Sequence, residues 1–246
     1  MQVIYEDNHL IIVNKAVGEI VQGDKTGDRT LADEVKQYIK EQYMKPGNVF
    51  LGVAHRLDRP VTGLVVFART SKCLSRLNEM FRTGQVHKTY WAIVPKVPVL
   101  STPAVASATT PLSPSDTSEG WTRLHHWLTR NEQQNRARAH QREVPGAKEA
   151  ILDYRPLSAT DRYQLLEIRL LTGRHHQIRC QLAAVGMPIR GDLKYGAPRS
   201  LPGGGIALHA RHVEFVHPVS RRPISVSAPV PSDDALWQAL SSVHSS

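Results

Sequence analysis

The chain has 246 residues, of which 41% are hydrophobic, 22% charged and 6% aromatic. This composition is typical of a globular protein and excludes collagen, a disulfide scaffold and disorder throughout. Its net charge of +9 at pH 7 favours a polyanionic partner such as nucleic acid.

The first predicted elements are strands and a helix. Apolar residues in 3–5 and 10–13, on either side of a turn-prone stretch, predict a hairpin or two short strands. Apolar residues then recur every four positions from Leu31 to Tyr43, which predicts an amphipathic helix. Thr30 is its expected N-cap, and Asp33 stands where a capping box places an acidic residue.

A second helix is predicted from Ser71, with Leu74, Leu77 and Phe81 on one face and Gly84 as its end. Strand candidates lie around this helix. They cover residues 49–53, 64–70 and 89–94.

The middle of the chain changes in character. Residues 98–120 are dominated by Pro, Ser and Thr, which predicts a flexible insertion. Residues 121–150 are basic, and we interpret the whole stretch of about 98–150 as a flexible and basic insertion that contributes little core. Its basic part either touches a polyanion or is a solvated face.

Regular elements resume after the insertion. Strands are predicted over residues 150–154, 163–171 and 213–216, and a helix over 177–185 with Gly186 as its end. Strands and helices are mixed along the chain and do not follow a strict βαβ alternation. The sequence therefore favours an α+β fold over a doubly wound sheet.

The densest polar cluster in an apolar neighbourhood is residues 55–60, His-Arg-Leu-Asp-Arg-Pro, between two strand candidates. Arginines flank Asp58 at positions 56 and 59, and nearby positive charge favours the ionised carboxylate. Asp58 is thus available as a nucleophile or a base. The alternative is a structural aspartate in a surface loop of ion pairs.

A second cluster, residues 172–179, lies where a predicted strand is followed by a predicted helix. Its backbone N–H groups and basic side chains are suited to binding an anion. Arg174 and Arg179 project from similar faces, so both could serve one pocket. A zinc site at His175 and His176 is the alternative, although adjacent residues point in different directions. In a third cluster, residues 88–90, Tyr90 either stacks on a base or belongs to the core.

These residues carry a resemblance. His55-Arg56-Leu57-Asp58, with Thr62-Gly63-Leu64, resembles the signature motif of the RluA-type RNA pseudouridine synthases. Residues 88–90 and 172–179 resemble that family's second and third motifs. Agreement continues to the C-terminus through residues 186–196, 208–210 and 215–231. Several motifs in the same order are more specific than any one, and they cover most of the chain outside residues 98–150.

The resemblance implies one pseudouridine synthase catalytic domain over residues 1–246, with a mixed, mainly antiparallel central sheet flanked by helices. Many relatives carry an N-terminal S4-type RNA-binding module, for which there is no room ahead of Val3. Recognition is therefore expected from the catalytic domain itself. Val61-Thr62 stands where the family usually has Thr-Ser, so one hydroxyl is lost, and activity is expected to survive because Asp58 remains.

The resemblance also implies the reaction, the isomerisation of a uridine to pseudouridine in structured ribosomal or transfer RNA. It makes Asp58 the essential carboxylate, Arg179 its ion-pair partner and Tyr90 the ring packed on the uracil. Arg56 would enter the space that the flipped base leaves. The further RNA-binding candidates are Lys88, Arg174, Arg190 and Lys194. No cofactor and no metal are expected, because no group or electron enters or leaves overall.

Two other hypotheses about the function are open at this point. A non-catalytic RNA-binding protein would explain the charge but not Asp58. A metal-dependent nuclease would need clustered carboxylates, and Asp58 has no acidic neighbour within ten residues. No apolar run approaches the ~20 residues that cross a bilayer, and the N-terminus lacks an export signal. We expect a cytoplasmic monomer with Cys73 and Cys180 as reduced thiols.

Overall fold

A computed structural model of the chain describes residues 1–23, 27–96, 109–110 and 120–242. It divides the chain into two compact units. The first comprises Met1–Lys88 and His209–Val230, and the second comprises Thr89–Leu208 and Pro231–Ser246. The single domain predicted over residues 1–246 thus contains two compact units, and the flexible part of the predicted insertion lies mostly outside the described residues.

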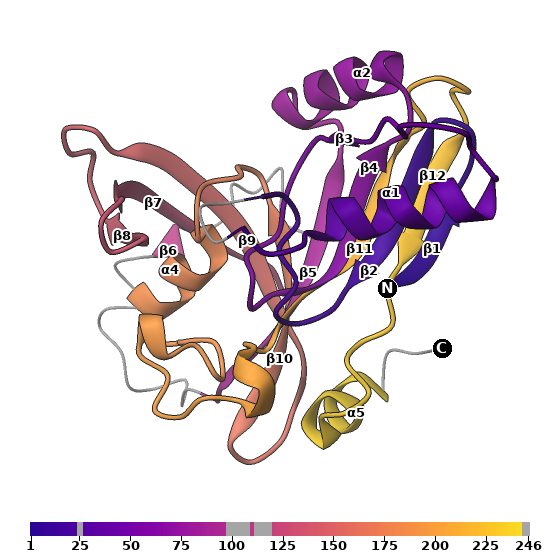
Figure 1. The fold of residues 1–246 in the computed structure, drawn as a ribbon. Helices are drawn as coiled ribbons and strands as arrows, with labels where there is room; N and C mark the ends of the chain where they lie inside the picture. Colours follow the sequence, from indigo (N-terminus) through magenta and orange to yellow (C-terminus); the bar gives the residue numbers. More distant parts are fainter. Residues whose placement is uncertain (24–26, 97–108, 111–119, 243–246) are drawn as a thin grey trace. The chain divides into compact units, whose positions relative to one another are not determined.

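The first unit is built on a mixed sheet (Figure 1). Its main strands follow the order β1 (Gln2–Glu6), β2 (Leu10–Lys15), β4 (Thr62–Ala68) and β11 (Leu208–Val216). Two shorter strands join them, because β3 (Gly52–Val53) pairs with β4 and β12 (Pro223–Ser227) pairs with β11. β11 runs parallel to β4, whereas β2 is antiparallel to both β1 and β4. The predicted N-terminal hairpin is confirmed.

Both helices predicted for the first unit form. α1 (Leu31–Gln42) has Thr30 as its N-cap, and the capping box with Asp33 is complete. α2 (Ser71–Arg82) is capped by the Thr70 side chain and ends just before Gly84, whose φ is +73°. Its apolar face packs on the sheet in one hydrophobic core, which includes Cys73, Leu77, Leu10, Leu64 and Phe215.

The second unit contains an antiparallel sheet with the order β5 (His87–Pro95), β10 (Tyr163–Leu170), β9 (Lys148–Ala159) and β7 (Thr122–Asn131). β6 (Thr109–Thr110) and β8 (Arg136–His140) both pair with β7. The helices are α4 (Gln177–Ala184) and α5 (Ala235–Ser241), with 3-10 turns at Leu193–Tyr195 and Pro202–Gly204. The predicted helix that ends before Gly186 is confirmed.

The basic half of the predicted insertion contributes more core than its composition suggested. Residues 120–150 contain β7, β8 and the first residues of β9 rather than a solvated spacer. Leu128, Ala137 and Ala150 are buried against Cys180 of α4 and Tyr195 in one hydrophobic cluster. The expectation of little core was wrong here, because a strand buries one face while its charged residues occupy the other.

The α+β class with a mixed, mainly antiparallel sheet is confirmed. Within the described part of the chain, no helix is long and apolar enough to cross a membrane.

Candidate active site

Residues 55–58 of the signature motif lie in the loop between β3 and β4, and residues 62–64 of the motif begin β4. Asp58 is half-buried there, and its carbonyl oxygen accepts a hydrogen bond from the Val61 N–H at 3.0 Å, which closes a turn. Arg56 and Arg59 are exposed, and Arg59 makes an ion pair with Asp28 at 3.3 Å. The loop thus presents a carboxylate between two arginines, one of which is held by another acid.

Lys15, the last residue of β2, anchors this loop. Its side chain is almost completely buried, and its Nζ donates to the carbonyl oxygens of Ala16 at 3.0 Å, Arg59 at 3.0 Å and Val61 at 2.6 Å. Burial lowers the pKa of Lys15 to about 8, while the charges of Glu19 and Asp58 act in the opposite direction. At neutral pH the ammonium therefore has three donors for three carbonyls, two of which belong to residues that follow Asp58 closely.

We expect Lys15→Met to reduce turnover roughly 100-fold. Loss of the anchor would displace Asp58, and a displacement of a catalytic group by about 1 Å can lower the rate by that factor. Each carbonyl left without a donor should also cost about 1–3 kcal/mol of unfolding free energy. The exposed Lys40→Met is the control in melting and turnover measurements. In the parent, turnover should fall as the pH rises through about 8, since a neutral amine has fewer donors. A Lys15→Met variant that retains this decline would contradict the positioning role.

The end of the signature motif is fixed by β11. The Thr62 hydroxyl lies 2.8 Å from Nδ1 of His209, a buried residue whose Nε2 lies 3.4 Å from the Ala228 carbonyl oxygen. Burial lowers the pKa of His209 to about 4, so the ring is neutral, and Nδ1 accepts from Thr62 if Nε2 carries the proton. The one hydroxyl that this motif retains is thus engaged in holding β4 to β11.

Lys88 and His55 share an aromatic neighbour in the first unit. The Lys88 Nζ lies 5.5 Å from the centre of the Phe81 ring, and the centre of the His55 ring lies 4.7 Å from it. Burial, assisted by the charge of Lys88, lowers the pKa of His55 to about 3. His55 is therefore neutral, and its Nε2 accepts a hydrogen bond from the Val66 N–H at 2.9 Å.

The second unit carries Tyr90 and Arg179. Tyr90 lies on β5 opposite Ile168 of β10 and is 8% exposed. Arg179, on α4, makes a buried bidentate ion pair with Asp192, with Nε and Nη2 donating at 2.7 and 2.9 Å. The sequence did not identify Asp192 as a site residue, although a buried guanidinium requires a carboxylate nearby.

Tyr195 lies beside this ion pair. The Arg179 guanidinium is 5.1 Å from the centre of the Tyr195 ring. Burial raises the pKa of Tyr195 to about 12, so its hydroxyl stays protonated. That hydroxyl accepts from the Ala137 N–H at 2.8 Å and lies 2.9 Å from Nδ1 of His176. The rings of His175 and His176 are stacked with their centres 3.8 Å apart.

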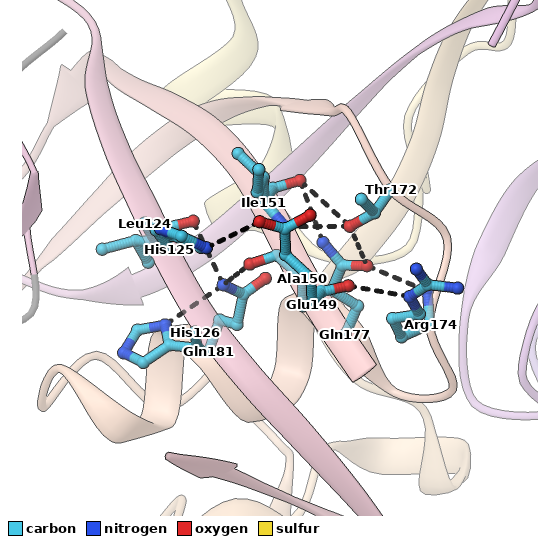
Figure 2. Close-up of polar contacts among 10 residues, drawn as sticks. All are labelled: Leu124, His125, His126, Glu149, Ala150, Ile151, Thr172, Arg174, Gln177 and Gln181. Atoms are coloured by element: carbon cyan, nitrogen blue, oxygen red, sulfur yellow. Dashed lines mark hydrogen bonds and ion pairs between the residues drawn. The ribbon is translucent and has the colours of Figure 1, made fainter. Parts of the chain in front are cut away.

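The loop before α4 is fastened to β9 by side-chain hydrogen bonds (Figure 2). The Thr172 hydroxyl accepts from the Ile151 N–H at 2.8 Å and donates to Oε1 of Gln177 at 2.9 Å. The Gln177 amide donates to the Ile151 carbonyl oxygen at 3.1 Å, and its oxygen accepts from the Arg174 N–H at 2.9 Å. This network fixes the segment that leads into Arg179.

Gln181 attaches α4 itself to the sheet (Figure 2). Its fully buried amide nitrogen lies within hydrogen-bond distance of the carbonyl oxygens of Leu124 and Ala150 and of Nδ1 of His126. Burial lowers the pKa of His126, so its neutral ring can accept. The catalytic candidate Arg179 therefore stands on a helix bonded to both β7 and β9.

The remaining RNA-binding candidates have different surroundings. Arg174 is exposed and donates from Nε to the Glu149 carbonyl oxygen at 2.8 Å, so it does not share the buried position of Arg179. Arg190 forms an ion pair with Asp234, the N-cap of α5. Lys194 is exposed and donates from Nζ to a carbonyl oxygen of the β7–β8 turn. Arg190 thus has a structural partner, whereas Arg174 and Lys194 remain accessible to solvent.

The first unit provides an anchored carboxylate, that of Asp58. The second unit provides the aromatic ring of Tyr90 and the fixed guanidinium of Arg179. An aspartate of this kind can act as a nucleophile or a base. Among the described residues, no group of three or more His, Cys, Asp and Glu is placed to hold a metal ion.

The chain resembles known proteins both in sequence and in fold. Residues 9–184 match the family model described as RNA pseudouridylate synthase. The chain is 32% identical to Ribosomal large subunit pseudouridine synthase D of Xylella fastidiosa, over 99% of this chain and 70% of that protein. It is 29% identical to tRNA pseudouridine synthase C of Vibrio cholerae, over 98% and 94% of the two chains. Human RNA Pseudouridylate Synthase Domain Containing 4 has a similar fold, with a TM-score of 0.72 at 23% identity over 97% and 92% of the chains.

Proposed function

This chain belongs to the RNA pseudouridylate synthase family, and we propose that Asp58 is the carboxylate with which it isomerises uridine in RNA. In that reaction the bond from N1 to the ribose C1′ breaks, the uracil turns in the site, and C5 bonds to C1′. The observation that carries the assignment is the anchoring of the Asp58 loop by Lys15. A buried lysine that bonds the carbonyls of residues 59 and 61 restrains the loop around the aspartate.

The other residues have supporting roles. A uracil inside a stack cannot present C1′ or C5 to a side chain, so it must be extruded at a cost of a few kcal/mol. Tyr90 packs on the extruded ring, and Arg56 enters the space that the base leaves. Arg179 is the cationic partner of the Asp58 carboxylate, and its bidentate pair with Asp192 fixes its guanidinium plane. The residues that face phosphates are Lys88, Arg174, Arg190 and Lys194.

The substrate that we propose is a structured ribosomal or transfer RNA. The two relatives from Xylella fastidiosa and Vibrio cholerae act, by their names, on the large ribosomal subunit and on tRNA respectively. The enzyme works as a cytoplasmic monomer and uses neither a metal nor a cofactor.

The test uses RNA labelled with tritium at C5 of uridine, incubated with the full chain in the presence of excess chelator. An unmodified large-subunit ribosomal RNA transcript and a pool of unmodified tRNA transcripts are assayed separately. Release of tritium with the RNA chain intact is expected from one of them. Binding without release would favour a non-catalytic RNA-binding protein. Cleavage of the RNA, or activity restored only by added metal, would overturn the proposal.

For Tyr90 we expect different outcomes with two substitutions. Tyr90→Phe should bind RNA almost as the parent does, because the stacking ring remains. Tyr90→Ala should lose roughly 1–3 kcal/mol of binding free energy, the range for one base stacked on an aromatic side chain. Affinity is measured by titration, with melting curves as the folding control. Equal binding by all three proteins would remove the stacking role.

A further inference from the structure

Two cationic side chains lie together at the turn between β7 and β8. Arg136 begins β8, and Lys194 comes from the 3-10 turn Leu193–Tyr195 and bonds to the carbonyl oxygen of Asn135, the residue before Arg136. We call them the hairpin-tip cluster. Both residues are exposed, and within the described ranges neither of them makes an ion pair. Their charge is therefore available to a partner.

The cluster is held in place rather than carried on a loose turn. Lys194 donates from Nζ to the carbonyl oxygens of Gln134 at 3.4 Å and Asn135 at 3.1 Å. The Ala137 N–H bonds to the Tyr195 hydroxyl, and Leu128 and Ala137 pack in the hydrophobic cluster with Cys180. Such bracing means that the two cations require little further ordering when an anion binds.

Tyr195 connects the hairpin-tip cluster to the candidate catalytic arginine. The guanidinium of Arg136 lies 5.3 Å from the centre of the Tyr195 ring, and that of Arg179 lies 5.1 Å from it. One buried ring thus has both guanidinium groups as neighbours within the second unit. An anion held at Arg136 would therefore lie beside the ring that also contacts Arg179, the residue that we propose as the partner of Asp58.

We propose that the hairpin-tip cluster binds phosphates of the RNA strand near the uridine that reacts. This inference rests on the proposed function and specifies which surface holds the substrate backbone. Phosphate is the chemistry that fits, because arginine presents a fork of donors and lysine a compact charge to its oxygens. The cluster would fix the register of the RNA without reading its sequence.

The test compares Arg136→Gln/Lys194→Gln with Arg138→Gln. Arg138 is an exposed residue of β8 opposite Thr129, and it serves as the matched control because it lies two positions beyond Arg136 on the same strand. Affinity for the RNA transcript that supports tritium release is measured across a salt series. The slope of log K against log salt should fall by about 1.4 to 1.8 in the double variant, at roughly 0.7 to 0.9 for each phosphate that the protein no longer neutralises. Arg138→Gln should keep the parent slope and turnover.

Arg136→Lys separates charge from packing, since it keeps the cation while altering the packing on Tyr195. It should keep most of the parent slope, whereas Arg136→Gln should show about half of the decrease seen in the double variant. Equal slopes for the double variant and the Arg138→Gln control would overturn the proposal, and so would equal decreases in Arg136→Lys and Arg136→Gln. If the parent released tritium in these experiments, the proposed function would stand even where the cluster failed. Absence of release from every RNA would count against the function itself.

Discussion

Pseudouridine formation by Asp58→Asn should fall by a factor of about 10² to 10⁴ or more, because the amide keeps the shape of the side chain but can neither attack C1′ nor accept a proton. The fold should be unaffected. The Lys15 bonds to this loop are made by backbone carbonyls of neighbouring residues, which the substitution leaves in place. Turnover is measured by tritium release, with melting temperature and RNA affinity measured on the same protein.

The matched control for this prediction is Asp28→Asn. Asp28 is an exposed carboxylate paired with Arg59, the residue that follows Asp58. The substitution removes one negative charge close to the loop without touching the proposed catalyst, so turnover should stay near the parent value. Product formation by Asp58→Asn within about tenfold of the parent would exclude the carboxylate as nucleophile or essential base.

Elements with local signals could be predicted from the sequence. The capping box of Thr30 and Asp33 and the four-residue spacing from Leu31 located α1 within a residue of its observed bounds. Gly186 likewise ended α4 where predicted. These signals succeed because the hydrogen bonds and the apolar face that they describe lie within one or two turns of the helix.

The basic segment after residue 120 shows why other elements were missed. Leu124, His126 and Leu128 alternate along β7 and are all buried, a period of two that predicts a strand. The charged residues elsewhere in the segment suggested a solvated face, and their abundance concealed the alternation. Composition averages the two faces of a strand, whereas burial applies to one face only.

The candidate site shows the same difference between local signals, which could be predicted, and long-range contacts, which could not. The motif residues were recognised because they are contiguous in sequence, but their supports are distant. Lys15 bonds to a carbonyl 46 residues away, and Tyr195 bonds to the N–H of a residue 58 positions earlier. Nothing local distinguishes Lys15 from a surface lysine. An indication was available only in its position at the end of an apolar strand, where an unpaired ammonium would be costly to bury.

Gly63 shows that a motif residue can be required by geometry rather than by chemistry. Its φ is +112°, and β4 and β11 approach each other at this point. A Cβ added here would lie 2.4 Å from the carbonyl oxygen of Ala210 and 2.5 Å from its nitrogen. Both obstacles are backbone atoms, so no side-chain rotation can relieve the overlap.

We therefore expect Gly63→Ala to lower the free energy of unfolding by about 2–5 kcal/mol, from overpacking of roughly 1–3 kcal/mol added to backbone strain of roughly 1–2 kcal/mol. Gly47→Ala is the matched control, because its φ of +107° is nearly the same and no atom lies within 4 Å of the added Cβ. The control should lose only the backbone term. Denaturant unfolding of both variants measures the difference, and equal losses would show that the close approach of Ala210 is not what requires glycine. Separation of β4 from β11 would also displace Thr62 from His209 and disturb the loop that holds Asp58, so turnover should fall in Gly63→Ala even at temperatures where the protein stays folded.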